Sequence, residues 1–310
     1  MSALELFWAS LAGGCPLSHR FRASTMWKDR SVAVIIPTYR ESATIRAVID
    51  EFEALGIPDE ILVVNNNAEP DTSEQVLATS AREIHEQVQG YGAAIRRGIA
   101  ESSADLICLC EADGTFDASD LPRLLAYADE FDFVYGSRTL RDLIWGGANM
   151  GRFLRWGNWG MAKVMELAFG AFHLSDIGCT MRVVSGPAAR FLLPHYTVTG
   201  GAFGPEMMLL SVIGGWRVVQ LPVNYRARRG RRGTTESFWK SVTIGLQMLA
   251  LLGSYWLRRR RIAARLRERG AASTRLLEPS AKGPGGEPKH MLPWVKLPRW
   301  RQRTRGVDHR

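Results

Sequence analysis

The sequence predicts an α/β fold, a doubly wound and mainly parallel sheet. Three runs of apolar and β-branched residues without polar alternation favour buried strands, at residues 31–37, 60–64 and 106–110. Segments with helical spacing separate these strands, at about 43–55, 73–80 and 90–102. Strands that alternate with helices in this way are typical of parallel strands joined by right-handed crossovers.

Local signals place the boundaries of these elements in order. Pro37 ends the first strand, and Ser42 or Thr44 is suited to cap the helix that follows. Three asparagines end the second strand, and a helix-like segment precedes the helix that opens at Gly90. A further strand is expected at 131–135, directly before the segment 136–138.

The central stretch, residues 106–117, combines an apolar strand with two acidic residues. Glu111 and Asp113 lie two residues apart, so in an extended segment their side chains point the same way. Open α/β sheets bind ligands at the carboxyl ends of their strands. The pair is therefore predicted to hold a divalent cation against a diphosphate; the alternative is a solvated acidic turn.

Charge is distributed unevenly along the 310 residues. Residues 258–310 hold 16 Lys and Arg against 4 Asp and Glu, whereas residues 1–257 hold 24 against 27. A near-neutral body argues against nucleic acid as a partner, and the basic end suits an anionic surface. Four cysteines show no metal-ligand spacing, and Cys108 and Cys110 are interpreted as core residues of a reducing compartment.

Several short segments occur in a characteristic order. They are P-T-Y-R-E (37–41), V-V-N-N-N (63–67), G-Y-G-A-A-I-R-R-G (90–98), E-A-D-G (111–114), G-S-R (136–138), G-A-N (147–149), D-I-G-C-T-M-R (176–182) and V-N-Y-R-A-R (223–228). Over residues 32–252 the chain resembles family 2 glycosyltransferases of the GT-A fold. Within that family it is most similar to dolichol- or polyprenol-phosphate hexose (mannose or glucose) synthases.

The resemblance implies a binding site for a nucleotide sugar, either a GDP- or a UDP-hexose. Asn65 and Asn66 stand where the family usually carries acidic residues, which leaves the identity of the base open. Gly90 and Gly92 are expected to let the backbone pass close to the nucleotide. The residues expected to bind the nucleotide are Pro37, Thr38, Tyr39, Glu41, Asn65, Asn66, Gly90, Gly92 and Ala112.

The resemblance also implies the catalytic groups. Glu111 and Asp113 are the expected ligands of Mg²⁺ or Mn²⁺, with Thr115 where the synthases often have a glutamine ligand. A lipid phosphate is already anionic near neutral pH, so it needs cations to hold it more than a general base. Arg138 and Arg182 are the expected catalytic arginines beside Asp113.

We expect four parts in the chain: an N-terminal extension (1–30), a GT-A catalytic domain (31–235), an amphipathic helix with a basic end (236–269) and a disordered basic tail (270–310). Residues 241–257 fall short of the ~20 apolar residues of a membrane span. They and the Trp-rich segment 145–172 are interpreted as interfacial helices. Core helices, or a short span at 241–257, are the alternatives. The tail is either a lipid tether or a solvated extension.

The function expected from these features is a metal-dependent, inverting glycosyltransferase. It would move a hexose from a nucleotide sugar to polyprenyl (dolichyl) phosphate at the cytoplasmic face of a membrane, to which it binds peripherally. Two alternatives stay open: the same catalytic domain acting on a glycan or glycolipid, and a non-catalytic nucleotide-binding scaffold. Nucleic-acid binding through the tail would leave the ordered segments unexplained.

Overall fold

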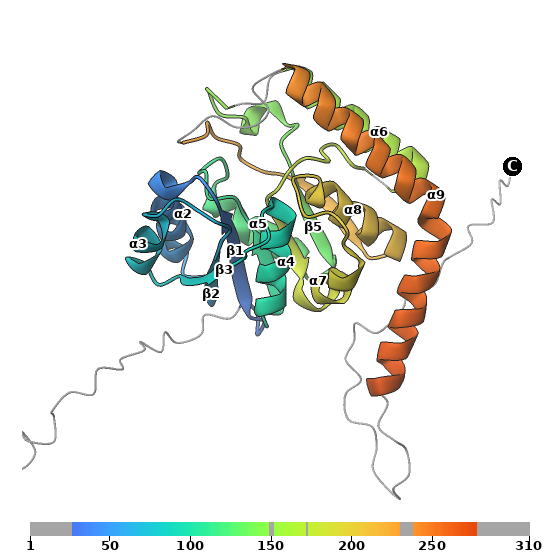
Figure 1. The fold of residues 1–310 in the computed structure, drawn as a ribbon, viewed down its shortest axis with the longest axis horizontal. Helices are drawn as coiled ribbons and strands as arrows, with labels where there is room; N and C mark the ends of the chain where they lie inside the picture. The colour runs from blue at the N-terminus through green and yellow to red at the C-terminus, as the bar shows by residue number, and fades with distance from the viewer. Residues whose placement is uncertain (1–26, 149–151, 172, 230–237, 278–310) are drawn as a thin grey trace, which may run out of the picture.

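The computed structural model describes residues 27–148, 152–171, 173–229 and 238–277. Within them the chain forms a seven-stranded sheet of order β3-β2-β1-β4-β6-β5-β7, flanked by helices on both faces (Figure 1). The strands are β1 (Val32–Thr38), β2 (Glu60–Asn65), β3 (Arg82–His85), β4 (Leu106–Leu109), β5 (Phe133–Ser137), β6 (Arg182–Ser185) and β7 (Val218–Pro222).

The sheet is mainly parallel, as predicted. Strand β1 pairs in parallel with β2 and β4, β2 with β3, and β5 with β7. Only β6 runs against its neighbours, β4 and β5, among the strands that the structure describes. The carboxyl ends of β1, β2 and β4 therefore meet at one edge of the sheet, where open α/β sheets bind ligands.

Two apolar clusters cover the two faces of the sheet. Along β1, Val34 and Ile36 face one cluster and Ile35 faces the other, because side chains of a strand alternate. The α-helices are α2 (Ser42–Ala54), α3 (Thr72–Leu77), α4 (Tyr91–Glu101), α5 (Leu121–Tyr127), α6 (Arg152–Phe169), α7 (Gly186–Leu192), α8 (Phe203–Gly214) and α9 (Phe238–Leu277). The short 3₁₀ helices are η1 (Ala118–Asp120), η2 (Arg141–Leu143) and η3 (Leu193–His195).

Helix α8 is largely apolar and mostly buried, as expected of a helix enclosed by other elements. Helix α4 packs against it from one side and α9 from another. Helix α9 also lies beside α6, so that the two form an outer layer of the molecule (Figure 1). None of the described helices combines the length and the apolar content that a membrane span requires.

Three details differ from the sequence prediction. Strand β3 was not predicted, since the expected helix ends at about residue 80; the residues R-E-I-H of β3 form a half-exposed edge strand. Strand β5 begins two positions later than expected. Helix α9 ends at Leu277, so the disordered tail expected from residue 270 is wrong for residues 270–277. The rest of the tail, and most of the N-terminal extension, lie outside the described residues.

Candidate active site

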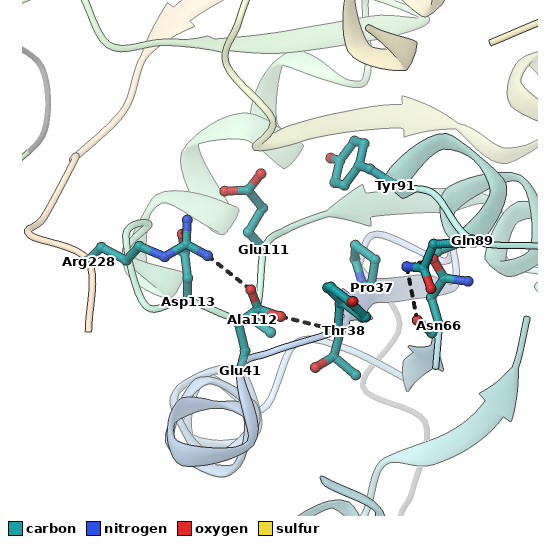
Figure 2. A pocket seen from close by; sticks show the side chains of 12 residues that line it. Pro37, Thr38, Glu41, Asn66, Gln89, Tyr91, Glu111, Ala112, Asp113 and Arg228 are labelled. Carbon is teal, nitrogen blue, oxygen red and sulfur yellow. Dashed lines mark hydrogen bonds and ion pairs between the residues drawn. The ribbon is translucent and has the colours of Figure 1, made fainter. Parts of the chain in front are cut away.

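A cavity of about 190 Å³ opens at the carboxyl edge of β1, β2 and β4 (Figure 2). The chain segments that follow these three strands form most of its wall, and the start of α4 and the segment after β7 complete it. The residues that line it are Pro37, Thr38, Tyr39, Glu41, Asn66, Gln89, Tyr91, Ala94, Glu111, Ala112, Asp113 and Arg228.

Most of the residues predicted from the sequence meet in this cavity. The residues brought together are Pro37, Thr38, Tyr39, Glu41, Asn66, Glu111, Ala112 and Asp113. Five predicted residues do not line it, namely Asn65, Gly90, Gly92, Arg138 and Arg182. Four lining residues had no assigned role: Gln89, Tyr91, Ala94 and Arg228.

The acidic segment after β4 is fixed by local hydrogen bonds. The Thr44 hydroxyl donates to the Ala112 carbonyl at 2.7 Å and so ties the segment to α2. Asp113, only 2% exposed, accepts hydrogen bonds on Oδ1 from the backbone amide of Thr115 (3.0 Å) and from its hydroxyl (2.6 Å). Thr115 thus orients Asp113, and the second carboxylate oxygen, Oδ2, remains directed toward the cavity side, where Arg228 lies.

Arg228 brings a positive charge to the acidic residues. Its Nη1 lies 3.3 Å from Asp113 Oδ2, and its Nη2 lies 2.9 Å from Glu41 Oε1. Figure 2 shows this side chain reaching across Asp113 toward Glu41. The other oxygen of Glu41 accepts hydrogen bonds from the amides of Tyr39 and Arg40. One arginine therefore connects the segments that follow β1 and β4.

The backbone around Arg228 is held beside the acidic segment. The amide of Arg226 donates to the Thr115 carbonyl at 2.7 Å, and the amide of Arg229 donates to the Asp113 carbonyl at 3.0 Å. The Arg226 guanidinium forms ion pairs with Glu51, at 3.0 Å, and with Asp117. The segment V-N-Y-R-A-R was the sequence signal for this part of the cavity. Its contact with Asp113 could not be predicted, because the two are far apart in the chain.

Electrostatic crowding is strongest at Glu111. Burial and the negative charge of Asp113 raise the pKa of Glu111 to about 7, against the opposing effect of Arg138 and Arg228. Burial raises the pKa of the neighbouring Tyr91 phenol far above its ordinary value, so that side chain is neutral. Glu111 is accordingly only partly ionised near pH 7, and a neutral hydroxyl lies beside it.

The two asparagines anchor loops. The Asn66 amide donates to the carbonyls of Glu86 and Val88, both at 2.8 Å, and its oxygen accepts from the Gly90 amide at 2.7 Å. Asn65 donates to Glu83 at 2.8 Å and accepts from the amide of Ala68. These bonds occupy both side-chain amides: Asn66 holds the loop before α4, whereas Asn65 connects β2 to β3 and to the turn at Ala68. Base recognition by the two asparagines stays a prediction, and Asn66 lines the cavity.

The two glycines of G-Y-G approach protein and not the cavity. A Cβ on Gly90 would lie 2.3 Å from the Thr199 carbonyl oxygen, and one on Gly92 would lie 2.8 Å from that of Val198. Gly90 also has φ of +147°, which few other residues adopt. We therefore revise their expected role: both positions admit the 198–199 segment against the start of α4.

Arg138 is bound by a buried partner. Its Nε lies 2.8 Å and its Nη2 3.1 Å from the two carboxylate oxygens of Asp176, a side chain without solvent exposure. Burial alone would raise the pKa of Asp176, but the charge and hydrogen bonds of Arg138 outweigh it and hold that pKa below its usual range. The charge of Arg138 thus lowers the pKa of Glu111, but its guanidinium is bound in the ion pair with Asp176.

Arg182 lies in the interior and not at the cavity. It begins β6, the strand between β4 and β5, and is 1% exposed. Its guanidinium donates to the backbone carbonyls of Thr180, Gly204 and Cys179. It also lies over the Tyr135 ring, 5.1 Å from the centroid. We revise the expected catalytic role, because every contact of this side chain supports the fold.

The three free cysteines in the described part of the chain are buried, in agreement with their interpretation as core residues. Burial raises the pKa of the Cys108 thiol to about 12, which keeps it protonated and unreactive. Cys15 lies outside the described residues.

A mainly parallel α/β sheet with a cavity at its carboxyl edge, lined by Glu111, Asp113 and four residues of P-T-Y-R-E, is the arrangement of the GT-A class. Residues 33–186 match the family model described as glycosyl transferase family 2. The chain belongs to this family, as the resemblance predicted, and is a glycosyltransferase.

Individual relatives agree with this assignment. An uncharacterized glycosyltransferase of Mycobacterium tuberculosis is 29% identical over 228 residues, which is 69% of this chain and 98% of the relative. A dolichyl-phosphate hexose transferase of Haloferax volcanii is 26% identical over 203 residues, 64% of this chain and 84% of the relative. The crystal structure of glucosyl-3-phosphoglycerate synthase from M. tuberculosis with Mn²⁺, UDP and phosphoglyceric acid superposes with a TM-score of 0.58 at 18% identity, over 74% of this chain and 79% of that chain. The last comparison establishes the shared GT-A fold.

Proposed function

We propose that this glycosyltransferase moves a hexose from a nucleoside diphosphate sugar to a polyprenyl phosphate, with inversion at the anomeric carbon. The observation that carries the proposal is the cavity itself. In it, Glu111 and Asp113 follow β4 and share the lining with residues of P-T-Y-R-E, and Arg228 contacts Asp113. Phosphate oxygens would lie between the acidic end and the guanidinium, with the nucleoside along Pro37, Thr38 and Tyr39.

The two carboxylates fit a divalent cation, Mg²⁺ or Mn²⁺. Their oxygens are the hard ligands that these ions prefer. Burial, and after it the charge of Asp113, raises the pKa of Glu111, and a dication would offset both effects. No cluster of three or more His, Cys, Asp or Glu ligands occurs in the described residues, so donor phosphates and water would complete the coordination. Bound there, the ion would stabilise charge that develops on the departing diphosphate.

Arg228 would act directly on the donor. With a dication at Asp113, the guanidinium is free to bind a diphosphate oxygen in the bidentate manner that arginine favours. Glu41 keeps that side chain close to the cavity through its 2.9 Å contact. The backbone contacts of residues 226 and 229 with the acidic segment hold the arginine at the site.

An anionic acceptor suits the groups that are present. A phosphate acceptor requires no strong base because its oxygen is already ionised, and a cation such as Arg228 in the cavity lining can hold it. The dolichyl-phosphate hexose transferase of H. volcanii supports a lipid phosphate as acceptor. A glycan or glycolipid hydroxyl would need a base to remove its proton, and so is the second acceptor class to test.

The outer helices support peripheral binding at the cytoplasmic face of a membrane. Trp156, Trp159 and Leu167 are exposed along α6 with helical spacing, as are Leu246, Leu249, Trp256 and Leu257 along α9. Arg258–Arg261 continue α9 directly after this apolar stripe. Exposed apolar residues followed by arginines are typical of helices that lie in the interface of an anionic leaflet.

The test is a donor screen with purified protein. UDP- and GDP-hexoses are incubated with Mn²⁺ and a short polyprenyl phosphate in detergent, and the product is identified by mass spectrometry. Asp113→Asn should lower transfer by at least about 100-fold, whereas the exposed control Asp71→Asn should transfer normally. Transfer to a glycan or glycolipid with none to the lipid phosphate would overturn the acceptor proposal. If the parent protein, Asp113→Asn and Asp71→Asn are equally inactive on every donor, the proposed reaction is overturned.

A further inference from the structure

A buried carboxylate outside the cavity connects α9 to α4. Glu206, in the first turn of α8, has no solvent exposure. Its Oε1 accepts hydrogen bonds from the Thr197 amide (2.9 Å), the Thr197 hydroxyl (2.6 Å) and the Tyr255 hydroxyl (2.5 Å). Its Oε2 accepts one from the Val198 amide at 3.0 Å. Four donors from two segments thus converge on one side chain that the proposed reaction does not use.

The segment held by Glu206 supports the start of α4. The Thr199 carbonyl accepts a hydrogen bond from the Ala93 amide at 3.0 Å. Both glycines of G-Y-G admit this segment, since a Cβ at either position would meet a backbone oxygen within 3 Å. Tyr91 and Ala94, on the same turn of α4, line the cavity, and so does Gln89 before it. The cavity wall on this side therefore rests on residues 197–199.

Tyr255 brings α9 into this arrangement. The side chain is buried, and its hydroxyl is the group of α9 that reaches the Glu206 carboxylate. Burial, followed by its hydrogen bond to Glu206, raises the pKa of this phenol, so it stays a hydrogen-bond donor. A simple alternative is that Glu206 is only a charge at the N-terminus of α8. That role would not require a partner from α9 or a contact with residues 197–198.

We propose that Glu206 and Tyr255 are positioning residues, through which α9 holds the α4 wall of the donor cavity in its binding geometry. The inference rests on the proposed function insofar as the cavity takes a nucleotide. It predicts that loss of the Tyr255 hydroxyl loosens residues 197–199 and the start of α4, and weakens nucleotide binding, although α9 is not part of the cavity.

Tyr255→Phe tests the proposal with a minimal change, and Tyr135→Phe is the matched control. The Tyr135 hydroxyl is also buried and forms one hydrogen bond, with the Ser211 hydroxyl at 3.0 Å, but it is not bonded to Glu206 or to residues 197–199. Amide hydrogen exchange is measured on the ligand-free proteins over peptides that contain residues 89–95 and 197–199. The dissociation constants of UDP and GDP are measured with saturating Mn²⁺.

In Tyr255→Phe we expect exchange in both peptides to accelerate, and the dissociation constant of the bound nucleotide to rise about fivefold, the effect of one lost hydrogen bond. Tyr135→Phe should change neither. Glu206→Gln should accelerate exchange and weaken nucleotide binding more than Tyr255→Phe does, because it also replaces an acceptor of the 197–198 amides. If Tyr255→Phe matches Tyr135→Phe in exchange and affinity, the proposal is overturned. If the unmodified protein binds neither nucleotide, the proposed function fails, and the exchange comparison still decides the role of Tyr255.

Discussion

Arg228 Nη1 lies 3.3 Å from Asp113 Oδ2, so a guanidinium occupies the side of the carboxylate that the proposed dication would use. The same arginine contacts Glu41 at 2.9 Å. The cavity therefore carries its own cation next to its acidic residues. A second positive charge at Asp113 has to displace or repel this one, which makes ion binding and the position of Arg228 interdependent.

Replacing Arg228 by glutamine should change metal and nucleotide affinity in opposite directions. Without the guanidinium, free Mn²⁺ no longer meets a competing cation, and its affinity should rise about three- to tenfold. UDP or GDP with saturating Mn²⁺ should bind more weakly, because the diphosphate loses a cationic partner. Electron paramagnetic resonance measures free Mn²⁺, and calorimetry measures the nucleotide. Arg217→Gln is the control, because Arg217 is exposed and lies just before β7, away from the cavity lining. Parallel changes in both affinities would count against the proposed role of Arg228.

Gly90→Ala should destabilise the protein by more than its backbone strain alone. The added Cβ would lie 2.3 Å from the Thr199 carbonyl oxygen, at a φ of +147°. We expect the free energy of unfolding to fall by about 2–4 kcal/mol in urea denaturation. Gly56→Ala, at a φ of +63° and facing open space, measures the ordinary strain of a left-handed position and should cost about 1 kcal/mol. Equal losses in the two variants would show that the close approach is unimportant.

The Arg138–Asp176 ion pair should make the free energy of unfolding decrease at acidic pH. The pKa of Asp176 is lower in the folded protein than the ordinary value of about 3.9. The ionised form therefore adds stability above pH ~4, and this contribution is lost as the pH falls through the depressed folded pKa. Asp176→Asn should lose about 3–5 kcal/mol near neutral pH, because it leaves Arg138 buried without a counter-charge.

Denaturation series between pH 7 and pH 2.5 test this pair. The difference in free energy of unfolding between the parent and Asp176→Asn should shrink toward the acid end. The exposed variant Asp71→Asn should follow the parent throughout. A difference that stays constant with pH would contradict the linkage between ionisation of Asp176 and folding.

Exposed leucines of α9 should contribute to vesicle binding. Leu246→Gln with Leu257→Gln removes apolar surface from the stripe, and cosedimentation with vesicles containing phosphatidylglycerol should weaken about tenfold or more. Leu77→Gln on α3 is the matched control, since Leu77 is 80% exposed and Leu257 is 77% exposed. Equal binding by the double variant and the control would remove α9 from the membrane proposal.

Much of the cavity follows from sequence because parallel strands place their carboxyl ends together. Pro37 to Glu41 follows β1, and Glu111 to Asp113 follows β4, so their meeting is a consequence of topology. Arg228 was not assigned, since its contact joins residues more than a hundred positions apart. Strand β3 was missed because a short polar edge strand has no apolar run.

The burial of arginines was the least accessible property. The sequence predicts Arg138 and Arg182 to be free cations. In the structure Asp176 forms an ion pair with Arg138, and Arg182 is buried because β6 lies antiparallel between β4 and β5. The amides of Asn65 and Asn66 likewise have partners that only the fold brings near, such as Glu83 and Val88. Residue type predicted the chemistry of these positions, whereas long-range packing decided which atoms stayed available.

The most direct test of the account is the position of the metal. Crystals grown with Mn²⁺ and UDP or GDP would be measured at the manganese absorption edge. We expect one anomalous peak within about 2.5 Å of an Asp113 oxygen and beside Glu111, with the Arg228 guanidinium moved onto the diphosphate. Nucleotide bound in the cavity with no ion at Asp113, and with Arg228 still paired to that carboxylate, would contradict it.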